Sequence, residues 1–267
     1  MTRSLTSTET ESLWRAAHAV ADAARPPTLA HFRAEGLSAD NKAAAGFDPV
    51  TAADRASEVA MRAEIARQRP QDAILGEEQE ATPGTSGLTW VLDPIDGTRG
   101  YLSGTPTWGV LVALADAAGP FLGIIDQPYV GERFWGGMGA AFVEGPLGRR
   151  ALKVRPARPL SQAILFTTFP EVGTEAEGAA FRRVASQARL TRYGMDCYAY
   201  ALLAAGQIDL VIEAGLQPYD VMAPIAVIEA AGGLMTDWQG RPAHQGGQIL
   251  AAASAEIHAE AMALLNG

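Results

Sequence analysis

An apolar segment that ends in two closely spaced acids constrains this chain more than any other feature. Residues 90–92, Trp-Val-Leu, have the composition of a buried strand, and Asp93 and Asp96 follow it. Pro94 and Gly97 fix a sharp turn between and after these acids. Two carboxylates so close repel each other, so a fold tolerates them best with a cation between them, and oxygen ligands favour Mg²⁺ over zinc. The alternative is a turn in which both acids face water.

Glu77 and Asp220 are two further acidic positions next to apolar segments. Glu77 and its neighbour Glu78 follow residues 73–75, Ala-Ile-Leu, where an exposed turn explains the acids without any chemistry. Asp220 stands at the start of an apolar helical segment, where capping of the helix N-terminus is a sufficient explanation. Neither position identifies a function by itself.

The composition and charge of the chain limit its partners. Of its 267 residues, 48% are hydrophobic and 19% are charged, close to the averages for globular proteins, so we expect a buried core. The 21 basic and 30 acidic side chains give 21 − 30 = −9, and no basic cluster offsets this charge. We therefore expect no nucleic-acid partner, whereas a small anionic ligand held by metal ions is compatible with the charge.

Cysteine content and hydropathy bear on the compartment. Cys197 is the single cysteine, which excludes an internal disulfide and a thiol metal site. Acidic residues interrupt the first 25 positions, which do not resemble a secretory signal, and no stretch of 18 apolar residues predicts a membrane span. We expect a cytoplasmic protein without a membrane partner.

Hydrophobic periodicity predicts a mixed α/β fold. Helical spacing is found near residues 8–25, 53–69, 175–188, 197–205, 221–231 and 256–265, and strand-like segments lie near residues 73–75, 90–92, 110–115, 121–125, 133–135, 163–166, 210–212, 234–236 and 249–252. A capping box from Thr8 to Glu11 is expected to begin the first helix, and Pro26 and Pro27 are expected to end it. Residues 116–120 predict a hairpin turn, so part of the sheet is antiparallel.

The segment 145–159 is richer in proline, glycine and arginine than its surroundings. Such a composition favours a boundary, so we expect an N-terminal subdomain, residues 1–145, with the acidic motifs and a C-terminal α/β subdomain, residues 146–267.

Four segments, in their order and spacing, resemble the inositol monophosphatase superfamily of Mg²⁺-dependent phosphomonoesterases. They are Asp-x-x-Thr-x-x-Asp at residues 48–54, Gly-Glu-Glu at 76–78, Asp-Pro-Ile-Asp-Gly-Thr at 93–98, and residues 219–233, where Tyr219 replaces the more usual tryptophan before the acid. The resemblance covers nearly the whole chain. It implies a layered αβαβα sandwich with mixed sheets, formed by a single catalytic domain of residues 1–267. The two packed halves of this domain would enclose a metal cleft. The resemblance also implies a homodimer.

The resemblance also implies a metal site with two or three Mg²⁺ ions. Glu77, Asp93 and the main-chain carbonyl of Ile95 would bind one ion, and Asp93, Asp96 and Asp220 would bind another. Four carboxylates in one cleft are tolerated only when such ions offset their charge.

The catalytic residues implied by the resemblance are Asp54, Thr98 and Glu77. Thr98, with Asp54 behind it, would orient the attacking water, and the main-chain N–H groups of Gly97 and Thr98 would bind the phosphate. No covalent intermediate is needed.

Several segments are similar to the histidinol-phosphate phosphatase branch, which serves histidine biosynthesis. They are residues 96–101, 104–109, 193–200, 204–211, 213–220 and 236–240. Asp196 and Glu213 occupy positions that face the alcohol part of the ester in the superfamily, and an acid at each suits a cationic substrate such as histidinol phosphate. The alternatives are a helix cap for Asp196 and a solvent-facing strand end for Glu213.

Three rival functions follow from the same residues. The first two are phosphatases for inositol 1-phosphate and for 3′-phosphoadenosine 5′-phosphate, and the latter would need more basic residues than Lys42 and Arg99. The third is a metal-binding scaffold that has kept the fold without activity. The joint presence of the six expected site residues argues against a scaffold, which needs none of them: Asp54, Glu77, Asp93, Asp96, Thr98 and Asp220.

Overall fold

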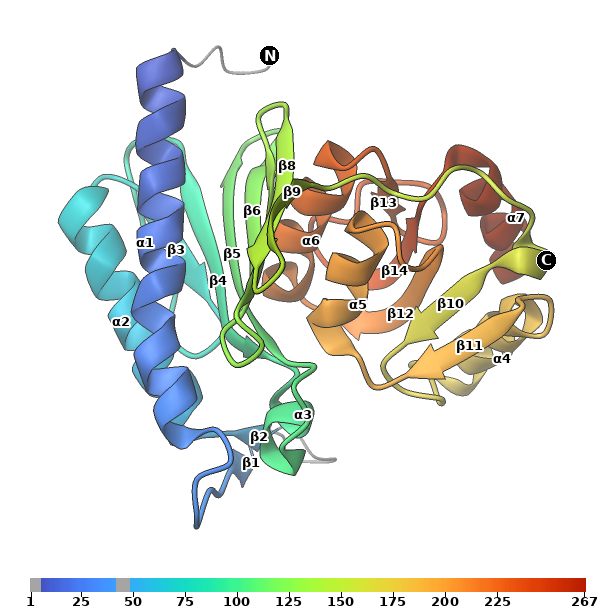
Figure 1. The fold of residues 1–267 in the computed structure, drawn as a ribbon, viewed down its shortest axis with the longest axis horizontal. Helices are drawn as coiled ribbons and strands as arrows, with labels where there is room; N and C mark the ends of the chain where they lie inside the picture. Colours follow the sequence, from blue (N-terminus) through green and yellow to red (C-terminus); the bar gives the residue numbers. More distant parts are fainter. Residues whose placement is uncertain (1–5, 42–48) are drawn as a thin grey trace.

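The computed structural model describes residues 6–41 and 49–267, in which helices and sheets alternate in five layers (Figure 1). The helical layers are α1 (Ser7–His31) with α2 (Ala52–Gln68), then α5 (Asp196–Ala204) with α6 (Pro218–Ala230) between the two large sheets, and α4 (Glu175–Ala185) with α7 (Ala255–Asn266) on the far side. The arrangement confirms the expected αβαβα sandwich with mixed sheets. Across the two described ranges, no helix is both long and apolar enough to cross a membrane.

The first large sheet has seven strands in sequence order. They are β3 (Ala73–Gly76), β4 (Thr89–Asp96), β5 (Gly109–Asp116), β6 (Gly119–Gln127), β7 (Glu132–Gly137), β8 (Ala140–Gly145) and β9 (Gly148–Ala151). The β3–β4 pair is parallel and the other pairs are antiparallel. Asp116 pairs with Gly119, which confirms the hairpin expected at this turn.

The second large sheet has five strands in a crossed order. From edge to edge they are β11 (Leu190–Tyr193), β10 (Ile164–Thr167), β12 (Leu210–Leu216), β14 (Gly247–Ala252) and β13 (Leu234–Thr236). Strand β10 is parallel to both of its neighbours, and β14 is antiparallel to β12 and β13. The remaining elements are β1 (Asp40–Asn41), β2 (Pro49–Val50), α3 (Thr98–Ser103) and the 3₁₀ turn at Leu160–Gln162.

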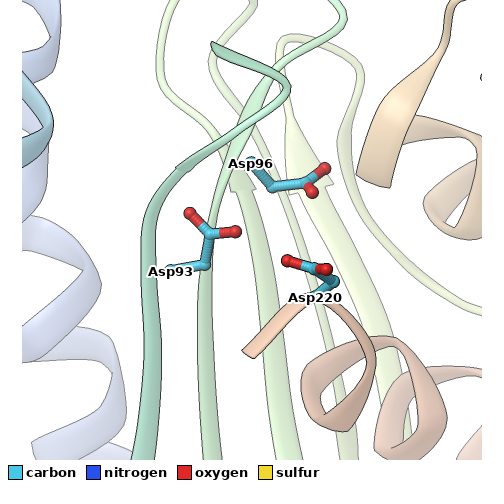
Figure 2. Close-up of side chains that lie close together, drawn as sticks. All are labelled: Asp93, Asp96 and Asp220. Atoms are coloured by element: carbon cyan, nitrogen blue, oxygen red, sulfur yellow. The ribbon is translucent and has the colours of Figure 1, made fainter. Parts of the chain in front are cut away.

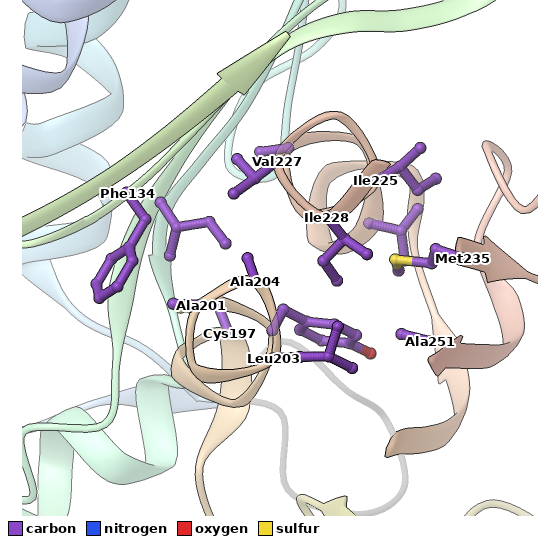
Figure 3. Close-up of a cluster of buried hydrophobic side chains, with 14 of the residues drawn as sticks. Phe134, Cys197, Ala201, Leu203, Ala204, Ile225, Val227, Ile228, Met235 and Ala251 are labelled. Atoms are coloured by element: carbon purple, nitrogen blue, oxygen red, sulfur yellow. The ribbon is translucent and has the colours of Figure 1, made fainter. Parts of the chain in front are cut away.

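Alternate residues of β4 face different cores, which explains its continuous apolar run. Trp90 and Leu92 pack with α1 and α2, while Val91 belongs to the core between the sheets. Figure 3 shows that central core, where Phe134 and Met235 lie on either side of side chains from α5 and α6. Strand β4 therefore ends where two buried layers meet.

Helix α1 differs from the prediction at both ends. Its capping box is formed two residues earlier than expected, because the Glu9 N–H donates to the Thr6 hydroxyl at 3.2 Å and the Thr6 N–H donates to Glu9 at 2.8 Å. The helix also continues through Pro26 and Pro27 to His31. The Tyr101 hydroxyl donates to the carbonyl of buried Thr28 at 2.6 Å, so tertiary contacts hold the last turn despite the lost main-chain donors.

Helix α2 leaves most of the apolar residues that gave residues 53–69 their helical spacing outside the core. Val59, one of the apolar residues in this helical spacing, is 57% exposed. The buried face instead contains Asp54, Ser57, Glu58 and Met61 among others. Burial of two acids on one face shows that this helix is oriented by polar contacts with the site.

Strands β8, β9 and β11 were not predicted. The glycines of residues 145–148 form the tight turn of the β8–β9 hairpin, where a subdomain boundary was expected. The chain leaves the first sheet only after Ala151, six residues beyond the expected division at residues 145 and 146. The two subdomains themselves stay a prediction.

Candidate active site

The parallel pairing of β3 with β4 brings two acids together. Gly76 lies opposite Leu92 in the register, so Glu77 and Asp93 are the next residues at the carboxyl ends of neighbouring strands. Parallel strands end at the same edge of a sheet, which makes this edge the place where side chains from separate segments converge. Helix α6 points its N-terminus at the same edge and supplies Asp220 (Figure 2).

Three carboxylates form the centre of the site. Oxygen atoms of Asp93, Asp96 and Asp220 lie within 4.8 Å of one another, grouped between the end of β4 and the start of α6 (Figure 2). Asp93 is only 1% exposed. The register of β4 shifts between Asp93 and Asp96, which pair with Leu111 and Gly109, and such a bulge turns the second acid toward the first.

All three acids of this cluster have raised pKa values. Burial raises the pKa of Asp93 well above its ordinary value, and the neighbouring carboxylates of Glu77, Asp96 and Asp220 raise it further. Burial also raises the pKa of Asp96, with Asp196 and Asp220 as the next causes. The pKa of Asp220 is raised to about 7, first by burial, although a hydrogen bond from the Gln217 N–H opposes this.

This donor set fits a hard divalent cation. Each acid holds a proton more tightly than usual, first because it is buried and then because other carboxylates lie nearby, and a cation among the oxygens would favour the ionised forms. The site consists of oxygen ligands, which suits Mg²⁺ better than softer metals. The carbonyl of Ile95 accepts from the Thr98 hydroxyl at 3.2 Å and retains a second lone pair, so it is compatible with the expected ligand role.

Asp54 and Thr98 come together as predicted. The N–H and hydroxyl of Thr51 at the N-terminus of α2 donate to Asp54 Oδ2 at 2.8 and 2.5 Å. The other oxygen, Oδ1, lies 3.5 Å from the Thr98 hydroxyl. The capping box of α2 thus fixes the carboxylate that faces Thr98. Asp48, the first acid of this motif, lies outside the described residues.

Gly97 must be a glycine for two reasons. Its φ of 88° lies in the left-handed region, and a Cβ atom at this position would lie 2.8 Å from Asp196 Cγ. The residue is the N-cap of α3, so the N–H groups of Gly97 and Thr98 stand at a helix N-terminus, where anions bind readily.

A cavity of about 350 Å³ adjoins these residues and contains both of the expected substrate contacts, Asp196 and Glu213. Asp196 has a φ of 44°, an unusual conformation for a residue with a side chain. The pKa of Asp196 is raised to about 7 by burial and by Glu213, while Arg99 opposes the shift. Asp96, Gly97, Thr98 and Asp220 also line the cavity.

Glu213 is buried and hydrogen-bonded, unlike a residue at a strand end that faces solvent. It is 6% exposed, and its Oε1 accepts from both the N–H and the hydroxyl of Thr168, at 3.0 and 2.5 Å. Oε2 accepts from the Tyr200 hydroxyl at 2.7 Å. Since each carboxylate oxygen can accept two hydrogen bonds, Oε2 retains one position for a ligand.

Glu58 is the residue that sequence reasoning missed. This buried carboxylate accepts from the N–H groups of Glu78 and Gln79, at 2.7 and 3.2 Å, and from Arg62 Nε at 2.7 Å. A Cβ atom on Gly76 would lie 2.3 Å from Glu58 Oε1, so Gly76 is needed to admit the carboxylate. The available signal was an acid four residues after Asp54, on the same face of α2.

Comparison with known proteins places the chain beside phosphatases. The inositol monophosphatase family model matches residues 2–266. The chain is 41% identical over 239 residues to the chloroplastic bifunctional phosphatase IMPL2 of Arabidopsis thaliana, and the aligned region covers 89% of this chain and 67% of that protein. It is 34% identical over 260 residues to a histidinol-phosphatase of Streptomyces coelicolor, covering 94% and 96% of the two chains. A solved inositol monophosphatase from Zymomonas mobilis superposes with a TM-score of 0.85 at 37% identity, covering 98% and 100%.

Proposed function

Since this chain belongs to the inositol monophosphatase family, we propose that it hydrolyses histidinol phosphate to histidinol and phosphate with Mg²⁺ as its cofactor. The enzyme is a phosphatase of that family, and the proposal concerns its substrate, its metal and its residue roles. The observation that carries the proposal is the cluster of Asp93, Asp96 and Asp220, whose oxygens lie within 4.8 Å of one another beside a cavity lined by two more acids.

In the proposed site, Glu77, Asp93, the Ile95 carbonyl, Asp96 and Asp220 hold two or three Mg²⁺ ions. When bound, these ions would bind the phosphoryl oxygens, lower the pKa of a water molecule and stabilise the leaving alkoxide. Glu77, Asp96 and Asp220 all lie close enough to Asp93 to raise its pKa, so Asp93 is best placed to serve more than one ion.

The chain's own catalytic groups orient the water and the phosphate. The Thr98 hydroxyl lies between Asp54 Oδ1 and the Ile95 carbonyl, at 3.5 and 3.2 Å, so it can position a water molecule for attack on phosphorus. The Gly97 and Thr98 N–H groups bind the phosphoryl oxygens. Glu77 joins Asp54 and Thr98 as a catalytic residue through its position beside Asp93.

Asp196 and Glu213 would select the cationic alcohol. Both line the cavity that adjoins the carboxylate cluster, and histidinol phosphate carries an ammonium group and an imidazole. A charge-assisted hydrogen bond from that ammonium group to Asp196 is stronger than a bond from a neutral hydroxyl. The remaining acceptor position on Glu213 Oε2 offers a second contact.

Inositol 1-phosphate is the second candidate substrate, because the chain is 37% identical to an inositol monophosphatase of known structure. Hydrolysis of 3′-phosphoadenosine 5′-phosphate has less support, since Arg99 is the single basic residue among those that line the cavity and Lys42 lies outside the described residues. A homodimer stays a prediction from the resemblance, and a cytoplasmic location stays a prediction from the cysteine content and hydropathy of the sequence.

Phosphate release from a panel of esters tests the proposed substrate. We expect kcat/KM to be highest for histidinol phosphate among histidinol phosphate, inositol 1-phosphate, 3′-phosphoadenosine 5′-phosphate and glycerol 2-phosphate. Asp196→Asn and Glu213→Gln should each lower kcat/KM for histidinol phosphate about tenfold to a hundredfold, from roughly 1.5 to 3 kcal/mol per charge-assisted hydrogen bond, and should affect glycerol 2-phosphate much less.

A matched control is Glu171→Gln, which removes the same charge from an exposed position that does not line the cavity. Its activity should equal that of the wild type on every ester. Preference for inositol 1-phosphate, or equal losses on both esters in the Asp196 and Glu213 variants, would reject the histidinol assignment and leave the phosphatase assignment intact.

A further inference from the structure

One exposed aromatic side chain, Phe169, lies in the lining of the cavity, and we call it the aromatic wall. Phe169 follows β10, lines the cavity with Asp196 and Glu213, and keeps 44% of its surface exposed. The guanidinium of Arg99, from α3, lies 4.7 Å from the centroid of the ring. A cation over an aromatic face is held by the quadrupole of the ring. Arg99 and Phe169 therefore join two segments that are distant in sequence.

The turn that carries Phe169 is fixed on both sides. Before it, the N–H and hydroxyl of Thr168 donate to the buried carboxylate of Glu213. After it, the Val172 N–H donates to the Phe169 carbonyl at 3.3 Å, and buried Val172 has a φ of 39°. A β-branched residue in the left-handed region is strained, and such strain persists where the surrounding structure fixes it, commonly at binding sites. The backbone thus holds the ring at the cavity.

The chemistry of this wall differs from that of the remaining cavity. An aromatic ring packs favourably against another flat ring in offset or edge-on geometry. A hydroxyl group placed against it loses water without gaining a hydrogen-bond partner. The wall therefore discriminates between alcohols by their shape, whereas the acids discriminate by charge.

We propose that Phe169 is a specificity-determining residue that packs against a planar ring in the alcohol part of the substrate. The inference rests on the proposed function, in which that ring is the imidazole of histidinol phosphate. Asp196 then faces the ammonium group, and Arg99 stacks on the Phe169 ring. A polyol ester presents hydroxyl groups to the same wall and gains less from it.

The substitution Phe169→Leu tests this role, because it keeps an apolar side chain and removes the ring. We expect KM for histidinol phosphate to rise about fivefold to tenfold while kcat stays within about twofold, and kcat/KM for glycerol 2-phosphate to change by less than about twofold. Phe169→Tyr keeps the ring and should match the wild type. Tyr193→Leu, which removes an equally exposed ring that does not line the cavity, is the matched control.

A rise in KM of the same size for both esters, or no rise for either, would overturn the inference. A second pair of esters, imidazolylethyl phosphate and propyl phosphate, lacks the ammonium group and separates this inference from the proposed substrate. If the wild type prefers inositol 1-phosphate to histidinol phosphate, the histidinol assignment fails. The role of the aromatic wall still stands in that case if the wild type favours the imidazole ester over propyl phosphate and Phe169→Leu abolishes this preference. If Phe169→Leu leaves that preference unchanged, the wall has no role in selection.

Discussion

Replacing Asp220 by asparagine should stabilise the metal-free enzyme while it abolishes most of the activity. The substitution removes one charge from the carboxylate cluster, and the amide oxygen can still accept the hydrogen bond from the Gln217 N–H. The folded state raises the pKa of Asp220 from 3.8 to about 7, so it holds the proton more tightly than the unfolded chain does. The resulting free-energy cost is absent below pH 3.8 and grows as the pH rises to about 7.

The size of the effect follows from that shift in pKa. At about 1.36 kcal/mol per pH unit, ionising Asp220 costs the folded state roughly 4 kcal/mol above pH 7. Neighbouring Asp93 and Asp96 also have raised pKa values, so the three carboxyl groups share the cost of ionisation, and we assign about half of it, roughly 2 kcal/mol, to Asp220. For a chain of this size, 2 kcal/mol corresponds to a shift in Tm of about 4 to 8 °C.

Differential scanning calorimetry in EDTA at about pH 4.5 and pH 8 measures this difference. Asp220→Asn should raise Tm by about 4 to 8 °C over the wild type at the higher pH and change it little at the lower pH. Comparing variant with wild type at each pH cancels the many other carboxyl groups that titrate in this range. A Tm difference that is the same at both pH values, or a variant that is less stable at pH 8, would refute the electrostatic reasoning.

Two further substitutions test the rest of the acidic site. Asp93→Asn should lower kcat/KM by about a hundredfold or more, because it removes a metal ligand, whereas Glu78→Gln should stay within about threefold. Phosphate release at saturating Mg²⁺ measures both values. Equal losses in the two variants would show that the ligands are misassigned. Glu58→Gln should lower the free energy of unfolding by about 2 kcal/mol, because a buried carboxylate with three charge-assisted donors becomes a neutral amide. It should also displace Glu77 and so weaken the binding of Mg²⁺, which calorimetry measures. An unchanged affinity for Mg²⁺ would show that Glu58 does not support the site.

The acidic motifs were predictable from sequence because they stand at the ends of strands and helices. The apolar runs before Glu77 and Asp93 predict strands, and parallel pairing of those strands is sufficient to bring the two acids together. Thr98 and Asp54 were placed by resemblance, and the structure brings them within 3.5 Å. Their catalytic roles stay predictions.

The features that sequence reasoning missed depend on tertiary contacts. Helix α1 passes two prolines because Tyr101, more than seventy residues away, holds its last turn. Helix α2 buries acids and exposes Val59 because Glu58 must reach the main chain at Glu78 and Gln79, which a count of apolar residues does not register. Strand β9 is exposed along its length, so it shows no apolar pattern, and its pairing with β8 alone defines it.

Dependence of phosphate release on Mg²⁺ tests most directly that the carboxylate cluster is a metal site for phosphoester hydrolysis. The measurement is the initial rate with histidinol phosphate and with glycerol 2-phosphate, after EDTA treatment and during titration with Mg²⁺. Because the acids repel one another and do not attract a phosphate dianion unaided, we expect no hydrolysis of either ester without a divalent cation and full recovery as Mg²⁺ is added. Activity that is undiminished by EDTA would contradict the assignment of Asp93, Asp96 and Asp220 as metal ligands.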